Sequence, residues 1–263
     1  MQIPLYQIDA FTDRLFAGNP AAVCLLDHWL ADATLLSIAA ENNLSETAFL
    51  VRQGEDYALR WFTPTVEVDL CGHATLASAH LILDRLEPGR GSVAFHTQKA
   101  GVLTVSRRDG WLSMDFPARP PKPTLHLPQL AEALGREPFC VLKARDLMAV
   151  FDSPEDVVQL TPDFAAIAAL DCWAVIATAP GRDGIDFVSR FFAPGHGVPE
   201  DPVTGSAHCT LVPYWAKRLG KTDLLARQVS ARGGTLHCQL AGDRVILAGQ
   251  AILYLEGRIT VPD

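Results

Sequence analysis

The sequence predicts an α+β protein built from two similar domains of roughly 130 residues each. Short motifs recur in the same order in the two halves, strand-like and helix-like segments alternate in both, and a proline-rich stretch separates them. An apolar content of 49% is enough for a hydrophobic core in each half. The expected ranges are residues 1–117 for the first half, 118–128 for the connector and 129–263 for the second half.

The matching segments of the two halves lie at a constant offset in sequence once one insertion in the second half is allowed for. The first pair of matching segments is separated by 130 residues and the two later pairs by 133, so one loop of the second half carries three extra residues. Three matches in the same order with one consistent insertion indicate a duplication. The matching pairs are RWFTP (60–64) with RFFAP (190–194), CGHA (71–74) with TGSA (204–207), and GVL (101–103) with GTL (234–236).

Apolar spacing predicts the elements of the first half in order. Residues 5–11 indicate a strand, followed by a turn at Gly18–Pro20 and an apolar run at 21–26. Residues 31–42 have helical spacing, with Asp32 as the expected N-cap. The remaining expected elements are a hairpin at 47–62, a helix at 74–86 and a second hairpin at 101–116.

The second half repeats part of this arrangement, with a helix from about Ser206 to Leu219 and a hairpin at 234–248. Five prolines between positions 117 and 128 predict an extended connector, because each ring restricts φ and removes a hydrogen-bond donor. A surface loop within one domain is the alternative. The alternating tail, at about 252–263, has no counterpart in the first half, and we expect it to return and pair with that half.

Charge and composition narrow the classes of function. Lys and Arg total 22 against 30 Asp and Glu, a net charge of −8 without a basic stripe, which argues against nucleic-acid and polybasic membrane binding. No apolar run approaches the roughly 18 residues of a membrane-spanning helix, and the amino terminus lacks the pattern of a secretory signal. Six scattered cysteines without a CxxC pair indicate reduced thiols. We therefore expect a cytoplasmic protein.

Gly72 and Gly205 occupy equivalent positions of the repeat, each just before a predicted helix. The first turn of a helix presents unpaired N–H groups with partial positive charge, and glycine lets a ligand approach them closely. We expect the two loops to face each other across a cleft and to hold a small carboxylate-bearing molecule. The alternative is that each glycine only permits a tight turn. Neither loop has the spacing of a dinucleotide or P-loop motif.

The polar side chains of these loops are candidate site residues. His73 and Ser206 are equivalent in the repeat, as are Cys71 and Thr204, and Asp201 lies five residues before Ser206. The helix dipole at His73 favours a neutral, hydrogen-bonding imidazole. Each residue also has a structural interpretation, as a cap, a core cysteine or a buried histidine with its hydrogen bonds satisfied.

Glu46 precedes the apolar strand that begins at Thr47, so the strand pattern directs it along the edge of the expected cleft. Partial desolvation raises the pKa of a carboxylate, which then both takes and returns a proton near neutral pH. A solvated glutamate at the start of a strand is the alternative.

These residues, in this order, resemble the phenazine-biosynthesis PhzF-like isomerase family. The resemblance implies the diaminopimelate-epimerase-like fold, in which each of two pseudo-symmetric domains is a curved, mostly antiparallel sheet around a central helix. It also implies a homodimer that needs no metal or organic cofactor. Its motifs are DAFT (9–12), GNPAAV (18–23), NLSETAF (43–49), CGHAT (71–75), FFAP (191–194), EDPVTGSAH (200–208) and RGG (232–234).

By position, the resemblance implies that Glu46 is the catalytic acid/base and that His73, Asp201 and Ser206 line the site and orient the substrate. The implied reaction removes a proton from one ring carbon of a dihydro-hydroxyanthranilate and returns it at another. One carboxylate performs both steps if the conjugated intermediate stays bound. The remaining expected substrate contacts are Gly72, Ala74, Thr204, Gly205 and Ala207.

Ala74 stands where the phenazine enzymes carry proline, and Val203 where they usually carry alanine, so the phenazine substrate does not follow. His208–Cys209 is more similar to an uncharacterised branch of the family. An amino-acid epimerase with two thiols is one alternative, although Cys71 faces Thr204, a hydroxyl far too weakly acidic to replace a thiolate. A small-molecule binding protein that has lost turnover is the other.

Overall fold

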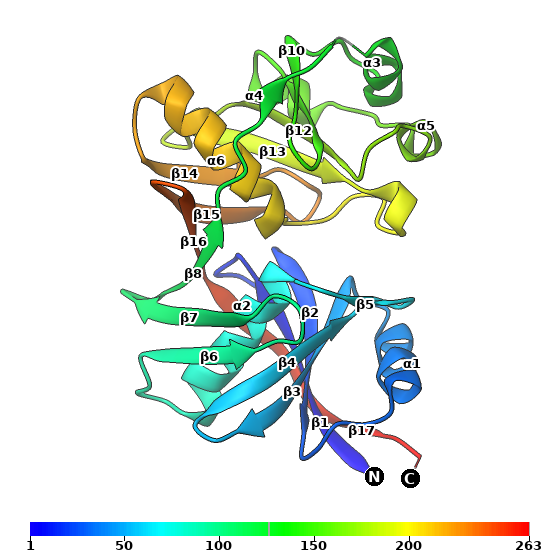
Figure 1. The fold of residues 1–263 in the computed structure, drawn as a ribbon, viewed down its shortest axis with the longest axis vertical. Helices are drawn as coiled ribbons and strands as arrows, with labels where there is room; N and C mark the ends of the chain where they lie inside the picture. Colours follow the sequence, from blue (N-terminus) through cyan, green and yellow to red (C-terminus); the bar gives the residue numbers. More distant parts are fainter. Residues whose placement is uncertain (126, 263) are drawn as a thin grey trace. The chain divides into compact units, whose positions relative to one another are not determined.

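The computed structural model describes residues 1–125 and 127–262, which fold into two compact units (Figure 1). Unit 1 comprises Met1–Asp115 and Ala248–Asp263, and unit 2 comprises Phe116–Leu247. The chain passes into unit 2 within β8 (Trp111–Pro117) and returns within β16 (Arg244–Gly249). Position 126 of the expected connector and position 263 of the tail lie outside the described residues.

The proline-rich segment is part of unit 2, because its backbone groups pair there. The N–H of Arg119 donates to the carbonyl of Cys209 over 2.8 Å. β9 (Lys122–Pro123) pairs antiparallel with β10 (Cys140–Lys143). Along the chain, the first boundary between the units therefore falls between residues 115 and 116, whereas the sequence predicted a separate connector at 118–128.

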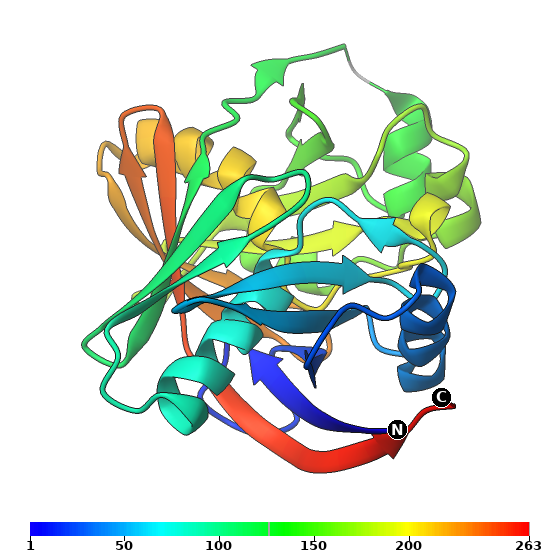
Figure 2. The ribbon, with the colours of Figure 1, turned by 60° about the horizontal axis from the view of Figure 1, so that its bottom comes forward.

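The tail lies in unit 1 as β17 (Ala251–Thr260), which pairs antiparallel with β1 (Gln2–Ala10) along its whole length. The N–H of Val261 donates to the carbonyl of Met1, and Figure 2 shows the two chain ends side by side. The two ends of the sequence thus form neighbouring strands of one sheet.

Unit 1 is a curved mixed sheet. From β1 it continues antiparallel to β2, parallel to β3, antiparallel to β4, parallel to β6, and antiparallel to β7 and then β8, while the short β5 pairs with β4. The bounds are β2 Asn19–Leu26, β3 Glu46–Gln53, β4 Asp56–Phe62, β5 Glu67–Val68, β6 Ser92–His96 and β7 Val102–Arg108.

The central helix of unit 1 is α2 (Gly72–His80). It packs against β1, β2, β3, β7 and β17, and every residue from His73 to Ala79 is buried. The helix predicted at 74–86 changes at Leu81–Leu86 into a π-helical segment, whose wider turn includes the bond from the N–H of Glu87 to the carbonyl of Ile82. The Glu87 carboxylate accepts hydrogen bonds from Arg52, Tyr57 and Arg90, which hold this end of the helix.

Helix α1 (Asp32–Asn42) contributes Leu35, Ile38 and Ala39 to the core of unit 1. Its N-cap is Ala31, so the prediction of Asp32 as the cap was wrong. Asp32 lies in the first turn instead, where its carboxylate accepts a hydrogen bond from Arg60 Nη1 over 2.9 Å. The helix thus begins at Asp32 itself, one position earlier than a cap at this residue would allow.

Unit 2 repeats the order of strand pairings found in unit 1. The series β2–β3–β4–β6–β7 alternates parallel and antiparallel pairs, and so does β11–β12–β13–β14–β15. The bounds are β11 Leu147–Val150, β12 Val175–Pro180, β13 Phe187–Phe192, β14 Asp223–Gln228 and β15 Gly234–Ala241.

An ion pair also recurs in the two units. Arg60 on β4 binds both carboxylate oxygens of Glu67, and Arg190 on β13 binds both oxygens of Glu200. Each guanidinium also lies 5.0 Å from the ring centre of the phenylalanine two residues later. Arg60 is buried and Arg190 is half-buried, with 11% of its side chain exposed, so the duplicated motif forms a structural clamp in each unit.

The helices of unit 2 complete its core. α6 (Gly205–Leu219) packs against β14 and β15 and buries Trp215, whose Nε1 donates to Thr178 Oγ1. None of the helices among the described residues has the length and apolar character needed to span a membrane. The remaining short helices are α3 Pro128–Leu134, α4 Pro154–Val158, α5 Phe164–Ala168 and the 3₁₀ turn η2 Pro194–His196.

Candidate functional site

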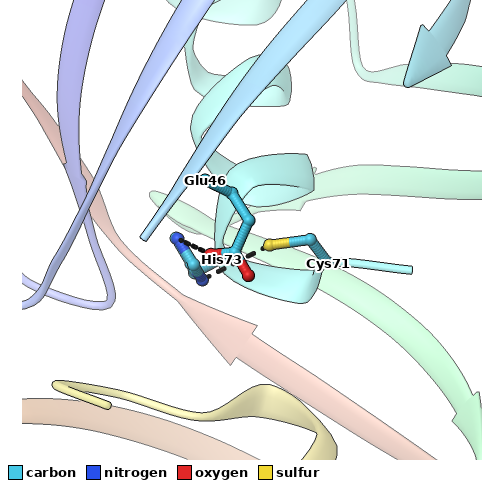
Figure 3. A group of neighbouring side chains, drawn as sticks. All are labelled: Glu46, Cys71 and His73. Atoms are coloured by element: carbon cyan, nitrogen blue, oxygen red, sulfur yellow. Dashed lines mark hydrogen bonds and ion pairs between the residues drawn. The ribbon is translucent and has the colours of Figure 1, made fainter. Parts of the chain in front are cut away.

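Three candidate residues of unit 1 lie close together (Figure 3): Glu46 and His73, which were predicted as site residues, and Cys71, which belongs to the epimerase alternative. They are called the Glu46–His73–Cys71 group. Glu46 begins β3, Cys71 immediately precedes α2, and His73 lies in the first turn of that helix. His73 Nε2 is 3.3 Å from Glu46 Oε2, and its Nδ1 is 3.5 Å from Cys71 Sγ. The imidazole therefore lies between the carboxylate and the thiol.

Burial controls the charge of His73. Its side chain is only 6% exposed, and desolvation lowers its pKa to about 3, so the ring is neutral near pH 7. The sequence predicted a neutral ring from the helix dipole, whereas the structure attributes the shift to burial. Glu46 keeps 17% of its side chain exposed, which leaves the carboxylate partly dry but reachable.

The same three side chains have the chemistry of zinc ligands, and their ligand atoms lie within 4.8 Å of one another. The thiol and the carboxylate, however, approach different nitrogens of the imidazole. A metal ion binds one ring nitrogen, and Nδ1 already receives the side-chain amide of Asn19 at 3.2 Å. The geometry fits a hydrogen-bonded group better than a metal centre.

The start of α2 presents backbone rather than side-chain donors. Gly72 is the first helical residue, and the extended Cys71 before it provides no side-chain cap within the described structure. Ala74, predicted to contact substrate, has a fully buried side chain. Ala207, its counterpart in unit 2, is 1% exposed, so neither alanine offers accessible surface to a ligand in this structure.

The predicted residues of unit 2 form two contacts at the start of α6. Thr204 Oγ1 donates to Asp201 Oδ2 over 2.5 Å. Gln228, fully buried at the end of β14, accepts from the N–H of Thr204 and donates to the carbonyl of Asp201. Gln228 thus links Asp201 and Thr204, the two ends of the loop, before Gly205 begins the helix.

Ser206 contacts the cation Arg145. Arg145 Nη2 donates to Ser206 Oγ over 3.2 Å, and the same Nη2 together with Nε also donates to the carboxylate of Asp146, whose side chain is 1% exposed. The guanidinium also lies 5.9 Å from the ring centre of Trp173, which stacks on His196. The Arg145 guanidinium therefore lies beside the first turn of α6 in unit 2.

Comparison with known proteins identifies the family of the chain. Residues 8–257 match the family described as phenazine biosynthesis-like proteins, PhzC–PhzF. The chain belongs to the PhzC–PhzF family. This PhzC–PhzF protein is 53% and 51% identical to two uncharacterized isomerases of Pseudomonas aeruginosa, each match covering 98% of this chain and 99% of the relative. Such relatives place it in the isomerase class of enzymes.

Solved structures agree with the fold. A PhzF-family protein of Enterococcus faecalis superposes with a TM-score of 0.96 at 47% identity, covering 99% of this chain and 100% of the other. A hydroxyproline epimerase of Agrobacterium vitis superposes with a TM-score of 0.60 at 11% identity, covering 100% and 93%. The second likeness concerns the fold alone, and the two together confirm the predicted epimerase-like α+β class of the PhzC–PhzF protein.

Sequence reasoning missed two residues of this PhzC–PhzF protein. Asn19 was treated only as part of a turn, yet it is fully buried and contacts His73. Arg145 lies in the polar stretch 143–146, which carries no periodic signal. The motif GNP (18–20) was a usable signal for Asn19, because a polar side chain at the start of an apolar strand needs a buried partner. No comparable signal marks Arg145.

Proposed function

We propose that this protein is a PhzF-like isomerase that moves a proton within a small carboxylate-bearing substrate, without a cofactor, and that Glu46 is its general acid/base. The observation that carries the proposal is the contact of Glu46 Oε2 with the neutral, buried His73 at 3.3 Å. A carboxylate held in this way, and still partly exposed, is suited to accept a proton and to return it.

In the proposed reaction, Glu46 removes a proton from a substrate carbon, and the electron pair of the broken C–H bond delocalises into the conjugated substrate. The protonated Glu46 then gives the same proton to a second carbon, where a new C–H bond forms. Substrate and product are isomers, so no oxidant or reductant is consumed. His73 stays neutral throughout and orients the carboxylate.

We propose further that the start of α6 binds the substrate carboxylate, with Ser206 and Asp201 orienting the molecule. Support comes from the backbone N–H groups that follow Gly205 and from the Arg145 guanidinium on Ser206. A helix start and a guanidinium both favour an anion. The start of α2 at Gly72 is the equivalent donor group of the first unit in this proposal.

Incorporation of solvent deuterium tests the proposal. The purified protein in D₂O is incubated with a panel of cyclic and amino-acid carboxylates, and isotope uptake at carbon is followed by NMR and mass spectrometry. Glu46→Gln should lower exchange by at least about 10²-fold while binding persists. Glu41→Gln, which removes an exposed carboxylate on α1, is the matched control and should leave exchange unchanged. Unchanged exchange in Glu46→Gln would overturn the proposal.

The two alternatives predict different results in the same assay. An epimerase based on a thiol would lose exchange in Cys71→Ala and keep it in Glu46→Gln. A binding protein would bind members of the panel without any exchange in the wild type. The Thr204 hydroxyl already donates to Asp201, which disfavours a second catalytic base at that position.

We also propose that the protein acts as a homodimer and does not bind nucleic acid. The acidic net charge of −8 supports the second part. Light scattering of the purified protein should give twice the 28.5 kDa mass of one chain, and a monomer at working concentration would contradict the dimer.

A further inference from the structure

We infer that Asn19 sets the tautomer of His73, so that the ring carries its proton on Nε2 and presents it to Glu46. Asn19 is thus a positioning residue, which acts on the carboxylate through the imidazole. The tautomer itself is a property of the protein without substrate, and only its catalytic consequence rests on the proposed function.

The contacts of His73 Nδ1 determine the assignment. The side-chain amide nitrogen of Asn19 lies 3.2 Å from Nδ1, and an amide nitrogen donates but cannot accept. Nδ1 must therefore be the unprotonated, accepting nitrogen of the ring. The Cys71 thiol, 3.5 Å from the same nitrogen, is a second and weaker donor toward it.

The remaining proton then belongs on Nε2. A neutral imidazole carries one N–H, and burial keeps His73 neutral over the working range of pH. Nε2 is the nitrogen that lies 3.3 Å from Glu46 Oε2, so its proton lies beside the carboxylate, in a contact that is not aligned as a hydrogen bond in this structure. Among the described residues, Glu46 and Cys71 are the titratable groups in contact with the ring.

The backbone around Asn19 holds its amide in place. Asn19 is the first residue of β2 and pairs with Ala10. Gly18 before it has φ of +66°, and a Cβ there would come within 2.2 Å of the Ala10 carbonyl oxygen. Two non-glycine residues of the same loop, Phe11 and Phe16, also have positive φ. Backbone conformations of this kind persist where the surrounding structure enforces them, often at functional sites.

The tautomer distinguishes the two oxygens of Glu46. Because Oε2 is buried and lies beside the Nε2 proton, we expect the proton taken from substrate to reside on Oε1. An N–H dipole beside the carboxylate also favours its ionised form, which is the form that acts first as a base. With the opposite tautomer, a lone pair of Nε2 would face Oε2, and the carboxylate would lose this stabilisation.

The tautomer is measured by NMR of the full-length protein labelled with ¹⁵N at histidine, without substrate. The His73 resonances are identified by their loss in His73→Gln. Two-bond ¹⁵N–¹H correlations should show a protonated Nε2 and an unprotonated Nδ1 near pH 7. A proton on Nδ1 in the wild type would overturn the inference, whatever the activity of the enzyme.

Two nearly isosteric substitutions, each of which adds one negative charge, provide the second test. Asn19→Asp replaces the donor with an acceptor and should move the proton to Nδ1 or protonate both nitrogens. Asn42→Asp adds the same charge beside β3, where Asn42 contacts Thr47, and should leave the His73 tautomer unchanged. An unchanged tautomer in Asn19→Asp would overturn the inference.

Activity separates the two proposals. If the protein is the proposed isomerase, Asn19→Asp should lower exchange by about 10²-fold with substrate binding kept. Exchange absent from the wild type, together with the Nε2 tautomer, would contradict the proposed function and leave the assignment of Asn19 intact.

Discussion

Arg145 donates a hydrogen bond from Nη2 to the hydroxyl of Ser206 over 3.2 Å, across 61 positions of sequence. Asp146, almost fully buried, accepts from Nε and from the same Nη2, and this two-point contact fixes the orientation of the guanidinium. An acidic chain thus places one oriented cation at the start of its longest described helix. The sequence predicted an anion site at this helix start, and the structure adds the Arg145 guanidinium beside it.

Substitution of Arg145 should therefore weaken substrate use. Arg145→Met removes the charge and keeps most of the side-chain volume, and we expect kcat/KM to fall about 10-fold to 100-fold, mainly through KM. Steady-state kinetics of deuterium exchange measure the change. Arg182→Met, which removes an exposed pair with Glu155, is the control and should leave kcat/KM unaltered. A wild-type KM in Arg145→Met would contradict a role in anion binding.

The buried histidines should make the protein sensitive to acid. Burial lowers the pKa of His208 to about 4, against an ordinary value of 6.5 in the unfolded chain. Between these values the unfolded state binds the proton and the folded state does not, so the free energy of unfolding falls as pH falls. The contribution of His208 to this slope is about 1.4 kcal/mol per pH unit.

Denaturant unfolding at several pH values checks this expectation. His208→Asn keeps a donor for the Thr204 carbonyl but removes the titrating ring, so its slope between pH 6.5 and 4 should be smaller than that of the wild type. The substitution His28→Gln at an exposed position should not alter the slope. Equal slopes in His208→Asn and wild type would show that the ring is protonated in the folded state as well.

Gly18 should tolerate no side chain. In Gly18→Ala the added Cβ would meet the Ala10 carbonyl oxygen at 2.2 Å, on top of a positive φ, and we expect a loss of about 3 kcal/mol or more of unfolding free energy. Gly54 has the same φ of +66° with open space around a Cβ, so Gly54→Ala should lose only about 1 kcal/mol. Chemical denaturation compares the two variants, and equal losses would mean that the contact with Ala10 relaxes.

The duplicated arginine clamps should be equally intolerant of lysine. Arg60→Lys and Arg190→Lys replace a two-point contact with glutamate by a single-point one, and each should lower the unfolding free energy by about 2 kcal/mol. Arg85→Lys, in an exposed pair with Glu256, should change it by less than about 0.5 kcal/mol. A loss of unfolding free energy in only one of the two clamp variants would show that the repeated ion pair stabilises one unit and not the other.

Much of the secondary structure followed from local patterns. The strands at 5–11, 21–26 and 47–62 and the helix before Leu219 appear close to their expected positions. The errors lie where side-chain contacts compete with local preference, as at Asp32, which binds Arg60 instead of capping α1. The end of α2 likewise becomes π-helical beside the anchored carboxylate of Glu87.

By itself, the sequence determined the duplication, the α+β class, the helix starts at Gly72 and Gly205, and the candidates Glu46 and His73. These features reside in spacing along the chain, where periods of 2 and 3.6 residues and recurring motifs are directly readable. Only the tertiary structure decided that Asn19 contacts the ring of His73. Such a contact depends on strand register and helix packing, which place side chains 54 positions apart within hydrogen-bonding distance and which no local pattern encodes.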